Sequence, residues 1–384
     1  MTQTHSPDMS GPAASAAEAP APLDPARTRA VHRAIGEARR GVPVILAGPQ
    51  PLIAAPAETV GAEGLHLIDR LGRAAATLLL APARAAAILR QSLDDAAPAV
   101  ALELARPLID PATLRRLADP TLEQIMPGFR RAAAPPLADA ALALGKLARL
   151  LPAMIAAPVR PGWASLPLGG GLLAVPAADL LGYNTNVAAT LHRVAEVAVP
   201  LDDAPDARLV AFRALDQGIE HMAILIGDPR AQAAPLVRVH SECFTGDLLG
   251  SLRCDCGPQL RGAIRRMAEE GGGVVLYLAQ EGRGIGLINK LRAYTLQDRG
   301  LDTLDANRAL GWQADERNFH IAAAMLAELD LDHIRLLTNN PDKVAGLAAC
   351  GVDVVERTPH VIAPNGVNDA YLQTKARRFG HLLD

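Results

Sequence analysis

The sequence predicts an α/β (mixed α+β) fold divided into two domains. At 384 residues, the chain is longer than a single hydrophobic core usually serves. Half of its residues are hydrophobic and 21% are charged, a composition typical of globular rather than disordered proteins. Strand and helix patterns alternate from about residue 190 onward, whereas the preceding part is rich in Ala and Pro. We therefore expect one domain at 26–190 and a second at 191–384.

The first domain is expected to begin with a helix and buried strands. Residues 1–25 are rich in Ala, Pro and Ser, with neither a basic start nor an apolar run, so they predict a disordered tail rather than a signal peptide. Residues 27–40 carry apolar side chains at helical spacing, and the apolar runs at 41–48 and 76–81 are typical of buried strands. The Ala- and Pro-rich stretch at 107–158 favours helices.

The second domain alternates between the two types of element. Strands are expected at 208–213, 221–226, 236–240, 273–278 and 334–338. Helices are expected at 259–270, 285–298 and 317–329. This order is typical of a mixed sheet with flanking helices.

Charge and hydropathy exclude some classes of partner. The net charge of −3 gives no overall attraction to nucleic acid or to an anionic membrane. The most apolar stretch, at 74–89, is interrupted by Pro82 and Arg84 and is shorter than the roughly 20 apolar residues that span a bilayer. We therefore expect a cytoplasmic protein with neither a nucleic-acid nor a membrane partner.

Three cysteines lie within 14 residues of one another, at Cys243, Cys254 and Cys256. Thiolates select soft metals such as zinc, and three protein ligands leave a fourth tetrahedral position for water, as in catalytic sites. Two alternatives stay open. One is a structural zinc with a fourth ligand such as His240, and the other is a set of buried cysteines that bind no metal.

Three further segments carry polar residues next to expected helices. The Gly-rich turn at 280–286 precedes a helix and suits an anion, although a plain turn has the same pattern, and Lys290 and Arg292 could lie on the helix's solvated face. The acidic residues of 314–319 suit either a site or simple helix capping. Polar residues at 336–343 follow a strand, where side chains commonly face a ligand.

Taken in order, RVHSEC, SLRCDCG, QEGRGIGL, NKLRAY, ADERNF and LLTNNPDK resemble the GTP cyclohydrolase II family over roughly residues 192–384. The spacing of Cys, ten residues, Cys, one residue, Cys is a specific part of this resemblance. The resemblance implies hydrolysis of GTP to 2,5-diamino-6-(5-phospho-ribosylamino)pyrimidin-4(3H)-one, formate and diphosphate, the first committed step of riboflavin biosynthesis. It further implies a homodimer, with one Zn²⁺ per subunit and Mg²⁺ on the GTP phosphates.

The resemblance also assigns roles to individual residues. It implies that Cys243, Cys254 and Cys256 bind zinc, which lowers the pKa of a bound water toward about 7. It implies GTP contacts from Arg238, Val239, His240, Ser241, Glu242, Gln259, Glu281, Gly282, Arg283, Thr303, Thr338 and Lys343. Asp315 matches the proton acceptor, Arg317 the proposed nucleophile and Tyr294 a residue lining the site. Because a guanidinium is normally protonated, Arg317 could instead act only as a charge clamp on the α-phosphate.

The N-terminal half faintly resembles 3,4-dihydroxy-2-butanone 4-phosphate synthase. In that family an acidic run that holds magnesium and substrate follows the first strand, but here the stretch reads GPQPLIAAPAETVGAEG, with only Glu58 and Glu63. We therefore expect a degenerate domain at 26–190 that is noncatalytic, with a stabilising, dimerising or regulatory role. Two alternatives for the whole chain are a cyclohydrolase-like paralogue of pyrimidine catabolism and a zinc-stabilised, noncatalytic regulatory protein.

Overall fold

The computed structural model describes residues 24–94, 96–123, 128–166, 171–215 and 218–382. Most of the expected tail at 1–25 lies outside the described residues. Its last residue, Pro25, already belongs to the first helix, because Asp24 accepts a hydrogen bond from the backbone N–H of Ala26 and Pro suits the first helical position. The ordered N-terminal half thus starts slightly earlier than the sequence pattern indicates.

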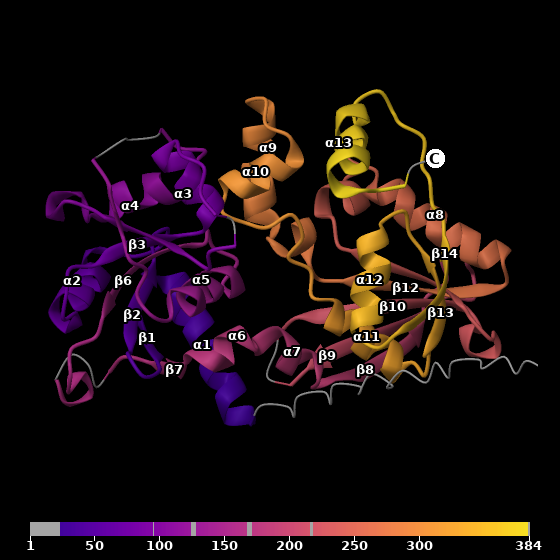
Figure 1. Ribbon diagram of the computed structural model, residues 1–384. Helices are drawn as coiled ribbons and strands as arrows, with labels where there is room; N and C mark the ends of the chain where they lie inside the picture. Colours follow the sequence, from indigo (N-terminus) through magenta and orange to yellow (C-terminus); the bar gives the residue numbers. More distant parts are fainter. Residues whose placement is uncertain (1–23, 95, 124–127, 167–170, 216–217, 383–384) are drawn as a thin grey trace, which may run out of the picture.

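The described part of the N-terminal half contains a seven-stranded sheet (Figure 1). Its strands are β1 (Val44–Ala47), β2 (Leu52–Pro56), β3 (Thr77–Leu80), β4 (Val100–Glu103), β5 (Arg130–Ala132), β6 (Ala153–Pro158) and β7 (Ala174–Pro176). Its helices are α1 (Pro25–Arg40), α2 (Ala62–Leu71), α3 (Pro82–Leu89), α4 (Pro111–Ala118), α5 (Ala138–Leu147), α6 (Ala177–Leu181) and α7 (Tyr183–Ala188). The strand order is β5-β4-β3-β6-β2-β1-β7, and the pairing is antiparallel except between β1 and β7.

The Ala- and Pro-rich stretch at 107–158 is only partly helical. Helices α4 and α5 confirm the expectation, but Ala153–Pro158 forms strand β6. This strand lies between β3 and β2 and is almost wholly buried. Pairing on both sides and burial outweigh the helix propensity of its Ala residues.

The described part of the C-terminal half contains a second seven-stranded sheet. Its strands are β8 (Leu191–Ala198), β9 (Arg208–Ala214), β10 (Glu220–Gly227), β11 (Leu236–Ser241), β12 (Gly272–Leu278), β13 (His333–Leu337) and β14 (Asp353–Thr358). Its helices are α8 (Cys256–Glu269), α9 (Leu287–Asp298), α10 (Thr303–Ala309), α11 (Phe319–Glu328), α12 (Pro341–Ala349) and α13 (Asp369–Phe379). The strands and helices expected after residue 190 are therefore present, with ends shifted by a few residues.

The C-terminal sheet changes from parallel to antiparallel pairing at β12. In the order β14-β13-β11-β12-β10-β9-β8, the first four strands are parallel and the rest are antiparallel. Parallel strands need crossover connections, and α8 and α12 are two of these. The carboxyl ends of β11, β12 and β13 consequently meet at one edge of the sheet, where ligands of such folds usually bind.

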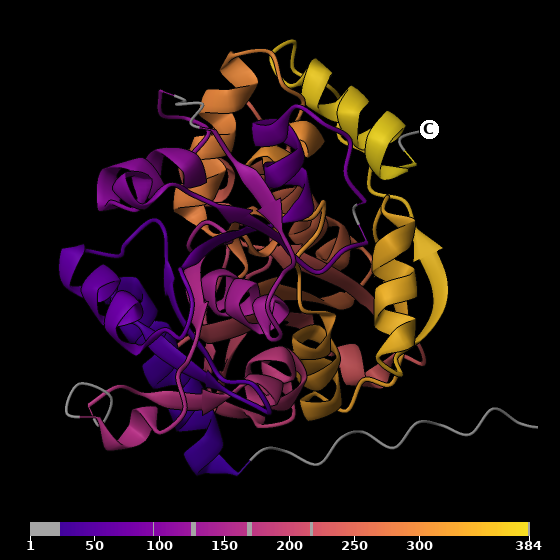
Figure 2. The same cartoon turned by 60° about the vertical axis from the view of Figure 1, so that its left-hand side comes forward.

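The two halves share hydrophobic cores. Ala293, Leu296 and Trp312 belong to the C-terminal half, yet they lie in one buried cluster with Leu80 and Leu114 of the N-terminal half. Helix α10 packs against α3, and Figure 1 shows α9 and α10 between the two sheets. Figure 2 shows the same two helices against the N-terminal half from a second direction. The change in composition near residue 190 therefore separates the two sheets, although the two halves pack together in shared hydrophobic clusters.

None of the helices in the described ranges is long and apolar enough to cross a membrane.

Candidate active site

Three cysteine side chains converge at the edge of the C-terminal sheet. Cys243 follows β11, Cys254 lies in the next loop, and Cys256 begins α8. Their Sγ atoms all lie within 4.8 Å of one another, and those of Cys243 and Cys254 are 3.8 Å apart. Tetrahedral zinc with bonds of about 2.3 Å separates its sulfur ligands by about 3.8 Å. The donor set and spacing therefore fit zinc, and no other such group of His, Cys, Asp or Glu occurs among the described residues.

A glycine lets the backbone pass close to these sulfurs. Gly246 lies in the turn Phe244–Leu248, and its N–H donates to Cys243 Sγ at 3.3 Å. A Cβ on this residue would lie 2.7 Å from the Sγ of Cys254 and 3.0 Å from that of Cys243. The turn therefore closes over the three thiols only because this position carries no side chain.

His240 is not available as a fourth metal ligand. Its Nε2 lies 3.1 Å from both carboxylate oxygens of Asp247, and its Nδ1 accepts a hydrogen bond from Arg238 Nε at 3.4 Å. Burial lowers the pKa of His240, so the ring is neutral and donates from Nε2. Both ring nitrogens are engaged, which argues against the alternative of a structural zinc that includes His240.

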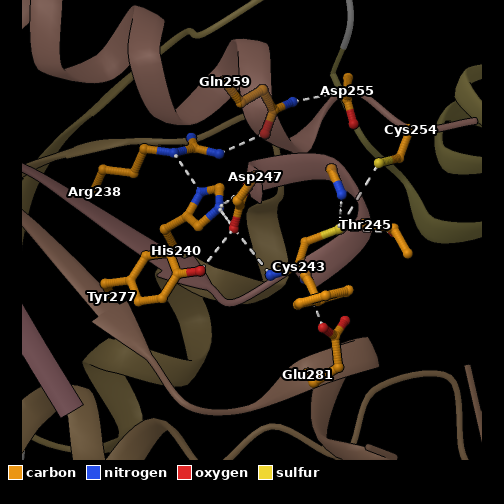
Figure 3. A network of polar contacts seen from close by, with 12 residues as sticks. Arg238, His240, Cys243, Thr245, Asp247, Cys254, Asp255, Gln259, Tyr277 and Glu281 are labelled. Carbon is orange, nitrogen blue, oxygen red and sulfur yellow. Dashed lines mark hydrogen bonds and ion pairs between the residues drawn. The ribbon is translucent and has the colours of Figure 1, made fainter. Parts of the chain in front are cut away.

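Asp247 organises the segment that carries Cys243 (Figure 3). Besides His240, its carboxylate accepts hydrogen bonds from the backbone N–H of Cys243 at 2.9 Å and from the Tyr277 hydroxyl at 3.0 Å. Two strands, β11 and β12, thereby hold the first cysteine in place. The sequence analysis missed Asp247, although its position four residues after Cys243, within the same turn, was a usable signal.

Lys290 of α9 points at the thiols rather than into solvent. Its Nζ lies 3.0 Å from Cys243 Sγ and 2.8 Å from Glu281 Oε1. Burial lowers the pKa of Lys290, but hydrogen bonds to Glu281 and Cys243 outweigh burial and leave the pKa raised. The alternative that this lysine lies on the solvated face of the helix is wrong, because its side chain is largely buried and its ammonium contacts Cys243 and Glu281. A protonated ammonium in this position stabilises a neighbouring thiolate.

Tyr294 lies one turn further along α9 and lines the same cavity. Its hydroxyl is 3.5 Å from Thr245 Oγ1, and the Arg253 guanidinium stacks 4.5 Å from the centre of its ring. Burial raises the pKa of Tyr294, so the phenol holds its proton at neutral pH. The side chain can therefore donate a proton but is a poor acceptor.

Basic side chains gather around the same cavity, although the whole chain is slightly acidic. Seven of them line it, namely Arg238, Arg253, Arg283, Lys290, Arg317, Lys343 and Lys375. Burial lowers the pKa of Arg238 to about 10. Burial, followed by the charges of Arg317 and Arg238, holds the pKa of Lys343 well below its usual range. The two guanidinium charges that lower the pKa of Lys343 indicate a site that suits an anion.

Arg317 faces the cavity with Asp315 behind it. The Nε of Arg317 donates to both carboxylate oxygens of Asp315, at 2.8 and 3.0 Å. Burial raises the pKa of Asp315, but its hydrogen bonds and ion pair with Arg317 outweigh burial and lower it. Helix α11 begins only at Phe319 and is capped by Asn318, whose side chain accepts from His320 N–H. The alternative that 315–317 simply cap the helix is therefore wrong.

Most residues that the sequence assigned to the site lie on this cavity. The residues lining it include the three cysteines, Arg238, His240, Ser241, Glu242, Gln259, Glu281, Gly282, Arg283, Tyr294, Thr303, Arg317 and Lys343. Val239, Thr338 and Asp315 are not on its wall. The Val239 carbonyl accepts from Lys343 Nζ at 2.7 Å, and Thr338 Oγ1 accepts from the N–H of Asn340 at 3.0 Å. These residues support the wall from behind.

Helix α13 adds residues that the sequence analysis missed. Tyr371 and Lys375 line the cavity, and Lys375 Nζ donates to Asp255 Oδ1 at 2.6 Å. Asp255 also accepts from Gln259 Nε2 at 2.5 Å, which links α13 to the start of α8. No sequence signal distinguished these residues from those on a surface helix.

A larger cleft, of about 720 Å³, lies at the junction of the two halves. His32 and Arg39 of α1 line it together with His221 and Gln280 of the C-terminal half. None of the three cysteines lines this cleft. The convergence of thiols and cations, rather than cavity size, therefore identifies the candidate active site.

Comparison with known proteins identifies the family of this chain. A family model described as GTP cyclohydrolase II matches residues 192–359. A protein of Azospirillum brasilense named GTP cyclohydrolase-2 is 46% identical over 95% of this chain and 97% of its own length. One of the same name from Pectobacterium atrosepticum is 52% identical, over 50% of this chain and 98% of its own length. The chain therefore belongs to the GTP cyclohydrolase II family.

Other similarities cover different parts of the chain. The riboflavin biosynthesis protein RibBA of Bacillus velezensis is 49% identical over 53% of this chain and 52% of its own length. A solved structure described as RibBX, a two-domain 3,4-dihydroxy-2-butanone 4-phosphate synthase from A. baumannii, covers 86% of this chain and 99% of its own, at 17% identity and a TM-score of 0.33. A TM-score that low does not establish a shared fold.

Proposed function

We propose that this protein is a GTP cyclohydrolase II that converts GTP to 2,5-diamino-6-(5-phospho-ribosylamino)pyrimidin-4(3H)-one, formate and diphosphate, in riboflavin biosynthesis. One observation carries the proposal: three convergent thiols and seven basic side chains share a single cavity. The reaction needs a nucleophile at the guanine base and a cationic surface for the triphosphate. Membership of the family, and a relative of that name that matches nearly the whole chain, support the same assignment.

We propose that Cys243, Cys254 and Cys256 hold one Zn²⁺ per subunit. When bound, zinc would supply a Lewis acid that generates a nucleophile from water at neutral pH. The chain's own residues prepare the ligands: the N–H of Gly246 and the ammonium of Lys290 both donate to Cys243 Sγ. These contacts favour the thiolate form that a metal requires.

Arg238, Arg317 and Lys343, which line the same cavity, would bind the phosphates. The lowered pKa of Lys343 reflects burial and then the charges of Arg317 and Arg238, which a bound polyanion would relieve. The Mg²⁺ expected with the phosphates would arrive with the substrate, because the described cavity wall offers only Glu242 and Glu281 as carboxylates.

We propose that Arg317 acts as a charge clamp rather than as a covalent nucleophile. The Asp315 carboxylate accepts a hydrogen bond from Arg317 and forms an ion pair with it, and a guanidinium is normally protonated, with no free electron pair to attack phosphorus. In this reading Asp315 orients the guanidinium from behind the cavity wall. Tyr294, which keeps its proton, would donate to the ring nitrogen that is released when the base opens.

We further propose that the N-terminal domain carries no reaction of its own, and that the protein acts in the cytoplasm as a homodimer. The absence of an acidic run in the sequence after β1 supports the first point. The family resemblance alone supports the cytoplasmic homodimer. No observation favours the pyrimidine-catabolism paralogue or a noncatalytic regulator.

The decisive experiment incubates the zinc-loaded protein with GTP and Mg²⁺ and measures formate, diphosphate and the diaminopyrimidine separately. We expect the three products in equal amounts, and none from ATP, which lacks the 2-amino and 6-oxo groups of guanine. Diphosphate release without formate, or equal turnover of ATP, would contradict the proposal.

A further inference from the structure

Arg149 of the N-terminal half touches three positions in the C-terminal half, all of them beside the candidate active site. It follows α5 with a left-handed φ of 57°. Its Nη2 donates to the carbonyl of Ala279 at 3.0 Å, and its own carbonyl accepts from Asn289 Nδ2 at 3.1 Å. Its stem lies over Gly286, where an added Cβ would be 3.3 Å from Arg149 Cδ.

The three partners of Arg149 frame the loop between β12 and α9. Ala279 follows the last residue of β12, and Gly286 caps the start of α9. Asn289 lies in the first turn of α9, fully buried, and directly precedes Lys290. The loop between them includes Glu281, whose carboxylate accepts from Phe244 N–H at 2.7 Å and from Lys290. A shift at the Arg149 contacts would therefore reach the ammonium that touches Cys243.

Both backbone polar groups of Ala279 are held by hydrogen bonds with side chains. Its N–H donates to Nδ1 of His221 at 3.1 Å, while Arg149 holds its carbonyl. Burial, followed by the charge of Arg149, lowers the pKa of His221 to about 4. The imidazole therefore stays neutral, and its Nδ1 is free to accept this bond. Strand β12 thus leaves the sheet in a fixed direction.

Further ion pairs join the N-terminal half to the segments that carry the site. Lys146 Nζ lies 2.5 Å from an oxygen of Glu316, the residue between Asp315 and Arg317. Arg292 of α9 pairs with Glu58 at 2.7 Å and with Asp119 at 2.9 Å. The side chains of all three pairs are largely buried, so solvent screens them less than surface pairs.

We propose that the N-terminal domain positions the GTP site in cis, with Arg149 as its main positioning residue. Arg149 fixes the loop at 279–286 and the start of α9, and through them the Lys290 ammonium and the Glu281 carboxylate. This inference rests on the proposed function. The inference applies only to chains that carry both halves. The Pectobacterium relative does not carry both, because 98% of its length aligns with only half of this chain.

The test compares two arginine variants in the full chain. Arg149→Met keeps the stem over Gly286 but removes the donor to Ala279. The control is Arg160→Met, because Arg160 Nη2 also donates to a backbone carbonyl, that of Gly72 at 2.8 Å, but within the N-terminal half. We expect Arg149→Met to lower kcat for formate release about 10- to 100-fold, with KM within about threefold, since small misplacements cost rate more than binding. Arg160→Met should keep the wild-type kcat.

Two further readouts separate positioning from a general loss of structure. Hydrogen exchange of amides at 279–290 should accelerate in Arg149→Met, while the urea midpoint stays close to that of Arg160→Met. Arg149→Lys keeps a cationic donor and should recover part of kcat; it also replaces Arg149→Met if that variant does not fold. A wild-type kcat in either Arg149 variant, or an equal loss in Arg160→Met, would overturn the proposal.

The exchange measurement also separates this proposal from the proposed function. If the wild type releases no formate from GTP, the proposed function fails, but exchange at 279–290 still reports on the positioning. Faster exchange there in Arg149→Met, with an unchanged urea midpoint, would support the positioning role. Unchanged exchange would overturn it, whatever the reaction proves to be.

Discussion

The two halves of the molecule have sheets of equal size but very different chemistry. In the N-terminal half, antiparallel pairing joins β1 to β2 through Gly48–Pro51, which carries no ionisable side chain. In the C-terminal half, parallel strands β11 and β12 are followed by Cys243 and Glu281, which both line the cavity. Sheet topology therefore provides a place for a site, whereas the residues in the following loops decide whether one exists.

Buried arginines in the two halves show the same contrast. Burial lowers the pKa of both Arg84 and Arg238 to about 10. Arg84 donates twice to the carbonyl of Leu117, near the end of α4, at 3.0 and 2.6 Å, which gives its charge a structural use. Arg238 also donates to a backbone carbonyl, that of Leu337 at 3.3 Å, but it lies on a cavity wall that it shares with six other cations. The shifted pKa alone therefore does not separate the two arginines, whereas the cavity beside Arg238 does.

The largest effect that would sharpen this contrast is expected from Cys254→Ser. A hydroxyl is a poor substitute for thiolate at a soft-ligand site, so we expect loss of most bound zinc and a fall in formate release of about 1000-fold or more. Metal analysis and a formate assay on the same sample test this. Cys350→Ser is the matched control, because Cys350 lies outside the cavity, near His320. Full zinc content with normal turnover in Cys254→Ser would contradict the ligand assignment.

A smaller effect, confined to the phosphate end, is expected from substitution of Arg317. A charge clamp predicts that Arg317→Ala lowers both diphosphate and formate release about 100- to 1000-fold, because one largely buried charge contact to the substrate is lost. Arg317→Lys should keep about a tenth of wild-type activity, because it retains the positive charge without the planar fork. Separate assays of diphosphate and formate compare the two variants. Equal inactivity of Lys and Ala would favour the covalent role instead.

Local patterns were enough to predict much of the fold and the centre of the site. Strands β9 to β13 follow from runs of apolar residues, whereas β8 and β14 were not predicted, and the cysteine spacing alone brought a metal into consideration. The family resemblance, rather than a local pattern, pointed to Asp315 and Arg317, and only Arg317 reaches the cavity wall. Which of two adjacent polar side chains faces a ligand depends on the loop path. Here the backbone N–H of Glu316 donates to the Arg283 carbonyl, a contact between segments far apart in sequence.

Tertiary contacts determine the surroundings of the remaining residues, which the sequence pattern could not predict. Lys290 and Arg292 share one helix, yet Lys290 meets the thiols and Arg292 meets Glu58 and Asp119 of the other half. Helical periodicity cannot show this, because the stripe that α9 leaves exposed carries the apolar residues Ile288 and Leu291, while the two basic side chains contact other parts of the molecule. Lys375 likewise becomes part of the site only because α13 folds back over α8 (Figure 1).

One of the two acidic residues that follow β1 has structural partners. Glu58 lies in the stretch where the family that the N-terminal half faintly resembles holds magnesium. Its Oε2 accepts from the backbone N–H of Leu151 at 2.8 Å, and its Oε1 pairs with Arg292 at 2.7 Å. Glu63 instead lies exposed in the first turn of α2. Neither carboxylate is placed for joint binding of a hard cation, which needs several convergent oxygens.

The smallest effect is therefore expected when ribulose 5-phosphate and Mg²⁺ are supplied to the full chain. Enolising a sugar phosphate requires a metal and a base held together, and the Glu58 carboxylate is already engaged by Leu151 and Arg292. We expect no dihydroxybutanone phosphate above background, with an authentic synthase as the positive control in the same assay. Glu58→Gln separates the two roles of this residue: it should weaken the pair with Arg292 and lower the urea midpoint without changing that background. Product formed by the wild type and lost in Glu58→Gln would show that the N-terminal half is an enzyme after all, and the contrast between the two halves would then be one of substrates rather than of chemistry.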